Sequence, residues 1–285
     1  MKTHCETLIV GAGMSGLLAA RELISAGQDV IVIDKAHGVG GRMATRRIDG
    51  ARFDHGAQFI SVRADEFRAH VDIWLEHGAA ELWSYGFADG RTGDGSLPTS
   101  SDDDTDGVHM PARDGHPRYR GRDGMTSIAK FLAQGADVRL GVQARLVRAL
   151  HDDGWEVEAD AGGTYRATSV ILTPPVPQTL DLIAGGSIEL DPDVRTRLET
   201  IQYAPCVAYL AITSNTVPLP RPGVLRAPSP AIEWIADNHA KGISTEGPAI
   251  TVHCAEDFSA RHYDEPDDEL IARVENELAS IVDLE

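Results

Sequence analysis

The chain has 285 residues, of which 42% are hydrophobic, and a formal net charge of −18 at pH 7. This length allows one large domain or two intertwined domains with a substantial core. The negative charge argues against binding to nucleic acid or to an anionic membrane surface. No run of about 20 apolar residues occurs, so no membrane span is expected. The cysteines lie far apart, which indicates a reducing compartment and predicts a cytoplasmic location: Cys5, Cys206 and Cys254.

The N-terminal part of the chain predicts a strand, a glycine-rich turn, a helix and a second strand. An apolar strand is expected over residues 6–10, a helix over 14–26 and a second strand over 29–34. The turn between the first strand and the helix has the pattern Gly-x-Gly-x-x-Gly at residues 11–16. This order of elements is typical of the beginning of a nucleotide-binding βαβ unit.

Each glycine of the turn has a separate expected purpose. Gly11 permits the tight turn, Gly13 lets backbone amides approach a pyrophosphate, and Gly16 lets the helix lie close to the strand. The N-terminal end of the helix directs unpaired N–H groups and a positive dipole end at that pyrophosphate. Asp34, about 20 residues further on, is placed to accept hydrogen bonds from a ribose. The sequence therefore predicts a dinucleotide site.

A second glycine cluster, from Gly38 to Met43, follows the acidic residue directly. A turn in this place can wrap the same pyrophosphate, and Arg42 can neutralise its charge. Domains that bind only NAD do not usually need such a turn. The second cluster therefore favours a flavin dinucleotide.

The remaining sequence alternates between strands, helices and loops. Residues 53–60 are expected to return to the nucleotide, residues 65–77 to form a helix, and the acidic run 102–106 to be a solvated loop tip. After a helix over 126–134, further strands are expected over 137–141, 146–150, 155–159, 167–173, 207–212, 232–236 and 250–253, and a last amphipathic helix over 267–283. Nucleotide-binding segments alternate with the others, so both domains are expected to be discontinuous.

Eight short segments share a family pattern: residues 11–16, 34–35, 40–43, 56–58, 124–128, 171–177, 237–241 and 252–253. Together they resemble the renalases, a family of FAD-dependent flavoproteins within a larger amine-oxidase-like group. The glycine motifs indicate only the broad group, whereas Arg42-Met43, the Gly-Ala-Gln at 56–58 and the Asp-Asn-x-x-Lys at 237–241 narrow the resemblance to renalases. The match runs along nearly the whole chain.

The resemblance implies an α/β fold. It consists of a Rossmann-like FAD-binding domain with p-hydroxybenzoate-hydroxylase-type topology and an interleaved α+β substrate domain built on an antiparallel sheet. We expect the FAD-binding domain to comprise residues 1–62 and 124–180, and the substrate domain residues 63–123 and 181–285. The oligomeric state is left open.

The resemblance also implies an oxidase of the 2- or 6-dihydro isomers of NAD(P)H. Hydride passes to FAD and then electrons pass to O2, which gives NAD(P)+ and H2O2. Loss of hydride from such a ring needs no general base, and no nucleophile signature or metal-ligand spacing is found in the sequence. The implied FAD contacts are Gly11, Ala12, Gly13, Met14, Ser15, Gly16, Asp34, Lys35, Gly41, Arg42, Met43, Gln58 and Phe59.

Several other residues are candidates for catalysis or substrate binding. By resemblance, Gln58 lies beside the flavin and is expected to hydrogen-bond its ring, in preference to a plain turn role. His253 matches a family histidine near the substrate side, although a buried structural histidine is an equally good interpretation. Trp234, Asn238 and Lys241 could line the substrate face, but an aromatic residue in a strand is more often part of the core. His55 is more often a satisfied interior histidine than a ligand contact.

Three arginines form a basic island in this acidic chain: Arg118, Arg120 and Arg122. An anionic nucleotide substrate would use such an island, and Arg120 is the predicted contact. The competing interpretation is a solvated loop that compensates the acidic run 102–106.

The sequence departs from the family pattern at its end. Flavoproteins of this group normally continue for about 50 residues beyond the last amphipathic helix and supply a Gly-Asp turn that holds the ribityl chain. No such turn is found, so the chain is expected to be either truncated or a divergent member with half of its flavin cradle. Two alternatives therefore stay open: a flavin amine oxidase or desaturase with another organic substrate, and an inactive dinucleotide-binding protein.

Overall fold

The computed structural model describes residues 2–90, 116–151, 153–160 and 163–282. The acidic run 102–106 lies outside these described residues. The chain divides into two compact units: unit 1 comprises residues 1–43 and 128–203, and unit 2 comprises residues 44–127 and 204–285. Among the described residues, no helix is long and apolar enough to cross a membrane.

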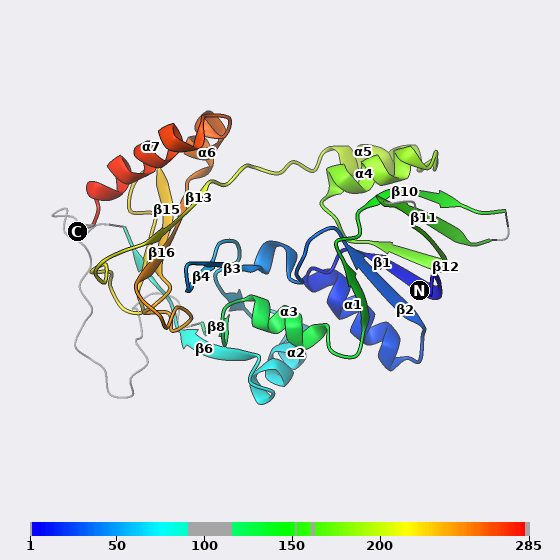
Figure 1. Cartoon of the computed structure of the whole chain (residues 1–285), viewed down its shortest axis with the longest axis horizontal. Helices are drawn as coiled ribbons and strands as arrows, with labels where there is room; N and C mark the ends of the chain where they lie inside the picture. Colours follow the sequence, from blue (N-terminus) through cyan, green and yellow to red (C-terminus); the bar gives the residue numbers. More distant parts are fainter. Residues whose placement is uncertain (1, 91–115, 152, 161–162, 283–285) are drawn as a thin grey trace. The chain divides into compact units, whose positions relative to one another are not determined.

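Unit 1 is built on a six-stranded sheet with the strand order β10-β11-β12-β1-β2-β9 (Figure 1). Strand β1 pairs in parallel with β2 on one side and β12 on the other, and β9 pairs in parallel with β2, whereas β10 and β11 are antiparallel. The strands are β1 (His4–Val10), β2 (Val30–Asp34), β9 (Asp137–Leu140), β10 (Ala144–Ala149), β11 (Trp155–Ala159) and β12 (Thr164–Leu172).

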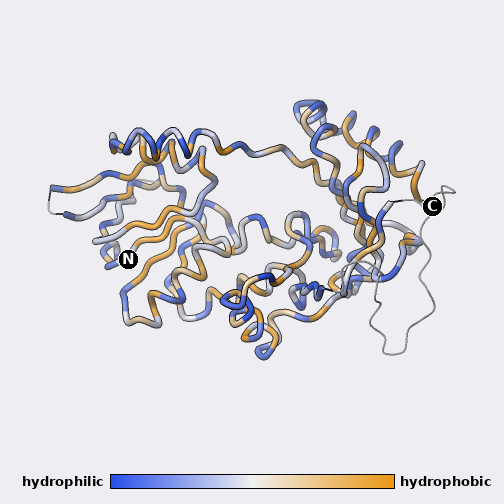
Figure 2. Tube along the Cα trace, turned by 180° about the vertical axis from the view of Figure 1, so that it is seen from behind, coloured by the Kyte–Doolittle hydropathy of each residue, from blue (hydrophilic) through white to orange (hydrophobic). Residues whose placement is uncertain are grey.

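The central strands of this sheet are almost continuous apolar runs, visible as hydrophobic segments near the N-terminus in Figure 2. Leu8, Ile9 and Val32 are completely buried, as expected for parallel strands covered on both faces. Helix α1 (Met14–Ser25) packs on β1 and β2 through Leu17 and Ala20, and α4 (Val176–Gly185) packs on β10. Unit 1 also contains α5 (Pro192–Glu199) and most of α3 (Thr126–Leu132).

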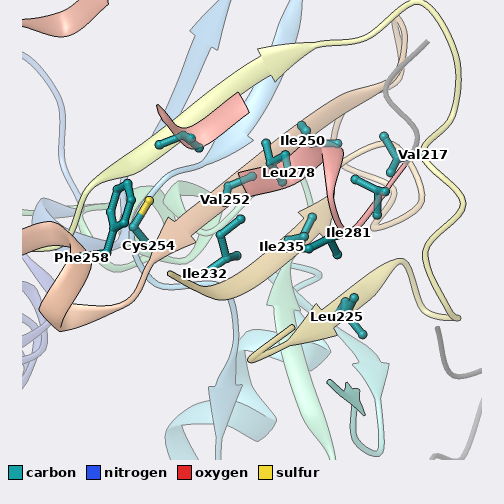
Figure 3. Packing of buried hydrophobic residues seen from close by; sticks show 12 residues of the cluster. Val217, Leu225, Ile232, Ile235, Ile250, Val252, Cys254, Phe258, Leu278 and Ile281 are labelled. Carbon is teal, nitrogen blue, oxygen red and sulfur yellow. The ribbon is translucent and has the colours of Figure 1, made fainter. Parts of the chain in front are cut away.

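Unit 2 contains a five-stranded sheet with the order β13-β16-β15-β14-β7. All neighbours pair antiparallel except β14 and β7. The apolar faces of two C-terminal helices pack on this sheet, with Phe258 and Leu278 beside Ile250 and Val252 (Figure 3). The elements are β7 (Ala88–Asp89), β13 (Ala208–Ile212), β14 (Val224–Arg226), β15 (Ile232–Asp237), β16 (Ala249–Cys254), α6 (Glu256–His262) and α7 (Asp267–Ala279).

Two smaller sheets and one helix complete unit 2. Strands β3 (Thr45–Ile48) and β4 (Ala51–Asp54) form a hairpin. Strand β8 (Arg118–Gly121) lies between β5 (Ile60–Ser61) and β6 (Ala80–Ser84), and α2 (Asp65–Glu76) precedes β6.

The predicted fold class is confirmed, since a Rossmann-like parallel sheet and an antiparallel sheet are both present. The hairpin β3–β4 was not expected. Residues 44–62, which the sequence assigns to the FAD-binding domain, cluster with unit 2. The reason is that strand β4 packs beside β16 and ends at Asp54, whose hydrogen bonds are all made to residues of unit 2. The last helix ends at Ala279.

Candidate functional site

The turn between β1 and α1 needs glycine at two positions. Gly11 has a φ of +111°, which L side chains rarely adopt, and its N–H donates to the carbonyl oxygen of Ile33 at 2.8 Å. A Cβ added at Gly16 would lie 2.0 Å from the carbonyl oxygen of Gly11. The helix therefore lies as close to the strand as the sequence predicts.

Gly13, between them, faces open space. A Cβ added there would meet no described atom within 4 Å. Gly13 is the N-cap of α1 and makes no side-chain cap hydrogen bond, so the first N–H groups of the helix lack a side-chain acceptor from the cap. N–H groups without a side-chain cap, the positive end of the helix dipole and open space together fit a pyrophosphate.

The second glycine cluster lies against the first. The Gly40 N–H donates to the carbonyl oxygen of Ala12 at 2.9 Å, and a Cβ added at Gly41 would lie 3.4 Å from the Cα of Gly13. Residues 41–43 form a short 3-10 helix in which Met43 is buried and Arg42 is exposed, with its guanidinium 5.9 Å from the Tyr203 ring. The two clusters therefore form one glycine-lined turn in unit 1.

Asp34 lies at the end of β2, where its two carboxylate oxygens accept backbone hydrogen bonds from Ala12 (2.6 Å) and Ala36 (2.7 Å). Each oxygen keeps a further lone pair, so a ribose hydroxyl can still donate to it. Lys35 is exposed and donates to the side-chain oxygen of Gln178 at 3.3 Å. Unit 1 thus brings together the predicted residues 11–16, 34 and 41–43, and they fit the ADP part of a flavin dinucleotide.

Unit 2 contains a buried ion pair between Lys241 and Asp54. The Lys241 ammonium lies 2.7 Å from an Asp54 carboxylate oxygen, and both side chains are completely buried. The other Asp54 oxygen accepts hydrogen bonds from the Thr45 hydroxyl (2.6 Å) and the Met125 N–H (2.8 Å). Burial lowers the pKa of Lys241, and the charge of Asp54 opposes this effect. Asp54 therefore joins the hairpin, the turn before α3 and the loop after β15.

Gln58 belongs to the same network. Its side-chain oxygen faces Lys241 at 3.4 Å, and its amide nitrogen donates to the carbonyl oxygens of Asp54 and Gly56. Both amide hydrogens of the predicted flavin contact are therefore used within its own loop.

Two residues that the sequence predicts to contact the substrate already have protein partners for their side chains. Asn238 is completely buried and donates to the Ala249 carbonyl oxygen and the Thr251 hydroxyl. The Arg120 guanidinium pairs with Glu81 at 2.9 Å, across the β6–β8 pairing, and also donates to backbone carbonyl oxygens. Burial lowers the pKa of Arg120.

Four aromatic side chains form a cluster in unit 2, which we call the aromatic cluster: Phe59, Trp83, Phe87 and Trp234. Phe87 is central, with ring centroids 4.9 Å from Trp83, 5.0 Å from Trp234 and 5.1 Å from Phe59. The indole N–H groups of Trp83 and Trp234 are buried and have no acceptor among the described residues. Trp83 also lines a cavity of about 420 Å³ together with Arg221, Asp237 and Ala240.

His253 lies on β16, and its Nε2 is 3.0 Å from the carbonyl oxygen of His55. A carbonyl oxygen only accepts, so Nε2 carries the hydrogen. Burial lowers the pKa of both histidines, and the charge of Arg46 adds to this effect at His55. Neutral His253 therefore has an unprotonated Nδ1, which is an acceptor.

The sequence did not single out Asp54, Trp83 or Phe87. The only signal for Asp54 is that it is the one carboxylate in the segment 51–60. Trp83 and Phe87 lie at the start of a stretch without clear periodicity, so nothing in the sequence places them beside Trp234.

Comparison with known proteins supports a flavoprotein. Residues 9–74 match the family described as NAD(P)-binding Rossmann-like domain, and residues 87–284 match the family described as flavin containing amine oxidoreductase. Renalase from Mus musculus is 27% identical over 273 residues, which are 90% of this chain and 74% of that protein. A local match to putrescine oxidase from Kocuria rosea is 43% identical over 67 residues, 24% of this chain and 14% of that protein.

Solved structures show the same fold. Putrescine oxidase bound to putrescine has a TM-score of 0.67 at 18% identity, over 98% of this chain and 81% of that chain. A fatty acid isomerase from P. acnes has a TM-score of 0.68 at 13% identity, over 99% of this chain and 84% of that chain.

These findings confirm the resemblance to renalase and FAD as the cofactor, since one matching family is a Rossmann-like nucleotide-binding domain and the other is flavin-containing. The chain belongs to the flavin containing amine oxidoreductase family and is an FAD-dependent oxidoreductase.

Proposed function

We propose that this protein oxidises the 2- or 6-dihydro isomers of NAD(P)H, with O2 as the final electron acceptor and NAD(P)+ and H2O2 as the products. The similarity to mouse renalase over 90% of the chain supports this assignment. The observation that carries it is the pair of buried indole N–H groups without an acceptor in the aromatic cluster.

These N–H groups favour a ligand that offers hydrogen-bond acceptors. A buried donor without a partner costs about 1–3 kcal/mol, so a ligand that supplies the acceptor recovers this free energy. A dihydronicotinamide has a flat ring that can pack on aromatic side chains and a carboxamide oxygen that accepts hydrogen bonds. A protonated amine offers only donors. The indole groups of Trp83 and Trp234 therefore favour the nicotinamide.

The charges around the aromatic cluster agree with this preference. The Lys241 ammonium lies 4.6 Å from the Trp83 ring centroid, and the Arg118 guanidinium lies 5.5 Å from that of Phe59. Both rings thus already have a cation against them, and a second cation close by is unfavourable. A nucleotide with an anionic pyrophosphate does not meet this penalty.

The side chains have binding and orienting roles in the proposed reaction. Bound FAD supplies the hydride acceptor and the route for electrons to O2. The nicotinamide ring becomes aromatic without losing a proton, so no side chain needs to act as a base. His253 can accept a hydrogen bond from the carboxamide N–H2 group through Nδ1, and Trp83 and Trp234 can donate to its oxygen. In unit 1, the glycine-lined turn would hold the pyrophosphate and Asp34 the ribose.

One observation favours a second candidate, oxidation of an amine. An ammonium group must lose a proton before it can give up hydride, and the unprotonated Nδ1 of neutral His253 could take it. The family match and the local match to putrescine oxidase are in keeping with this chemistry.

Anaerobic mixing separates the two candidates. The purified chain, loaded with FAD, would be mixed separately with 6-dihydro-NAD, with ordinary NADH (the 4-dihydro isomer) and with putrescine. The loss of flavin absorbance would be measured over time in each mixture. We expect 6-dihydro-NAD to bleach the flavin at least about a hundredfold faster than the other two. Faster bleaching by putrescine would contradict the proposal and establish the amine reaction. A chain that takes up FAD but is bleached by none of the three would contradict both.

A further inference from the structure

The ion pair between Lys241 and Asp54 lies beneath the aromatic cluster, and neither charge touches solvent. Taking two charges out of water is costly, and a buried pair of this kind often stabilises a protein no better than apolar side chains of the same size. Stability alone is therefore a poor explanation for a charged pair at this position.

The hydrogen bonds of the Lys241 ammonium all go to the loop formed by residues 54–59. It donates to the Asp54 carboxylate and to the Gln58 carbonyl oxygen, both at 2.7 Å, and its remaining side faces the Gln58 side-chain oxygen and the Trp83 ring. An ammonium group has no acceptor, so only the oxygen of the Gln58 carboxamide can face it. The amide nitrogen is thereby turned to the Asp54 and Gly56 carbonyl oxygens, which closes the loop on itself.

The loop held in this way carries two groups that face the proposed substrate region. The His55 carbonyl oxygen contacts His253, and the Phe59 ring lies 5.1 Å from Phe87 and 5.8 Å from Trp234. No hydrogen bond or ion pair joins Lys241 itself to either histidine in the described part of the chain. The charge of Lys241 also lowers the pKa of His253 through space, whereas its hold on the positions of His55 and Phe59 runs through the loop.

We propose that Lys241 is a positioning residue, which holds the 54–59 loop closed so that His55 and Phe59 are set for the substrate. This inference rests on the proposed function. The charge is needed because an apolar side chain of the same length could not bind the Asp54 carboxylate and the two Gln58 oxygens together. Asp54 is the matching anchor, since Thr45 and Met125 fix its other oxygen.

The test uses the double variant Asp54→Asn/Lys241→Met, which removes both charges and avoids an unpaired buried carboxylate. Glu156→Gln is the matched control, because Glu156 is also buried and bound to two arginines, Arg148 and Arg166, but lies on β11 in unit 1. If the double variant does not fold, Gln58→Met replaces it, since that change keeps the ion pair and removes the carboxamide that Lys241 holds.

Two measurements are made on the FAD-loaded chain. Amide hydrogen exchange in residues 54–59 should become at least about tenfold faster in the double variant and stay unchanged in Glu156→Gln. The KM for 6-dihydro-NAD should rise about tenfold with kcat changed less than about threefold, whereas the control keeps both constants.

Unchanged exchange in the loop would overturn the inference, and so would an unchanged KM despite faster exchange, because either result reduces the pair to a structural element. Failure of the proposed function is recognised separately: the wild-type chain would then not oxidise 6-dihydro-NAD at all. In that case the exchange measurement alone decides whether Lys241 holds the loop.

Discussion

The sites in the two units are built from different parts of the protein. In unit 1 the groups that face the proposed cofactor are backbone N–H groups and glycines within residues 11–43, together with one carboxylate. In unit 2 the groups are side chains from positions as far apart as Asp54 and His253. A site made of backbone depends on short local patterns, whereas a site made of side chains depends on how distant strands pair. Changes in the two units should therefore have different effects.

The largest effect is expected from Gly16→Ala in unit 1. Its Cβ would lie 2.0 Å from the Gly11 carbonyl oxygen and 3.2 Å from a methyl group of Ile9, so strand and helix must separate. Overpacking of this kind costs about 3 kcal/mol. Urea unfolding of the FAD-free chain should show this loss, and no loss would mean that the helix does not lie on the strand as described.

Gly13→Ser is the matched change at the next glycine of the same turn. Serine is a good N-cap, so the free energy of unfolding should stay the same or rise by a few tenths of a kcal/mol. Its hydroxyl would accept from the N–H groups that otherwise face the pyrophosphate, and its Cβ meets no described atom. We expect the Kd for FAD to rise about tenfold or more, as measured by titration of the FAD-free chain. An unchanged Kd would place the pyrophosphate elsewhere.

Trp234→Phe tests the side-chain site of unit 2. The change removes a buried N–H without an acceptor, which offsets part of the packing lost with the smaller ring, so the free energy of unfolding should fall by no more than about 1 kcal/mol. The KM for 6-dihydro-NAD should rise about tenfold, because the carboxamide loses a donor. Trp74→Phe is the control: Trp74 is also buried, but it belongs to α2, where its ring packs against Phe67. A stable Trp234→Phe variant with an unchanged KM would contradict the role of the indole group.

The smallest effect is expected from pH. Burial lowers the pKa of His253 and of His55, so as the pH falls through the ordinary histidine value of about 6.5 the unfolded chain takes up protons that the folded chain resists. The unfolded state then binds more protons, and the free energy of unfolding falls with the pH. His253→Gln should make this fall shallower in urea unfolding at a series of pH values. A slope that is the same in both proteins would mean that His253 is not held neutral.

The same difference between the units explains what the sequence could predict. The strand, turn, helix and acid of unit 1 follow one another within 34 residues, so their spacing alone predicts the dinucleotide site. The second cluster, residues 38–43, lies against the first because Gly40 pairs with Gly13 in a short bridge. That contact is local enough to be expected.

The unit 2 site is decided by pairings that leave no trace in the local sequence. The sequence places Arg120 in a basic island. In the structure, β6 and β8 pair so that Glu81 lies opposite Arg120 and forms an ion pair with it. The sequence analysis places Lys241 on the substrate face, yet its side chain is completely buried in an ion pair with Asp54. Trp83 and Trp234 come together only when the strand β6 and the strand β15 have their places in unit 2. Only the family resemblance pointed to the segment 237–241.

A crystal structure of the FAD-loaded chain with NAD+ would test the central claim most directly. We predict that the carboxamide oxygen of the nicotinamide accepts a hydrogen bond from the indole N–H of Trp83 or Trp234, at a distance of about 3 Å. The ring would then lie against the aromatic cluster. A nicotinamide bound elsewhere, with both indole groups still lacking an acceptor, would contradict the account.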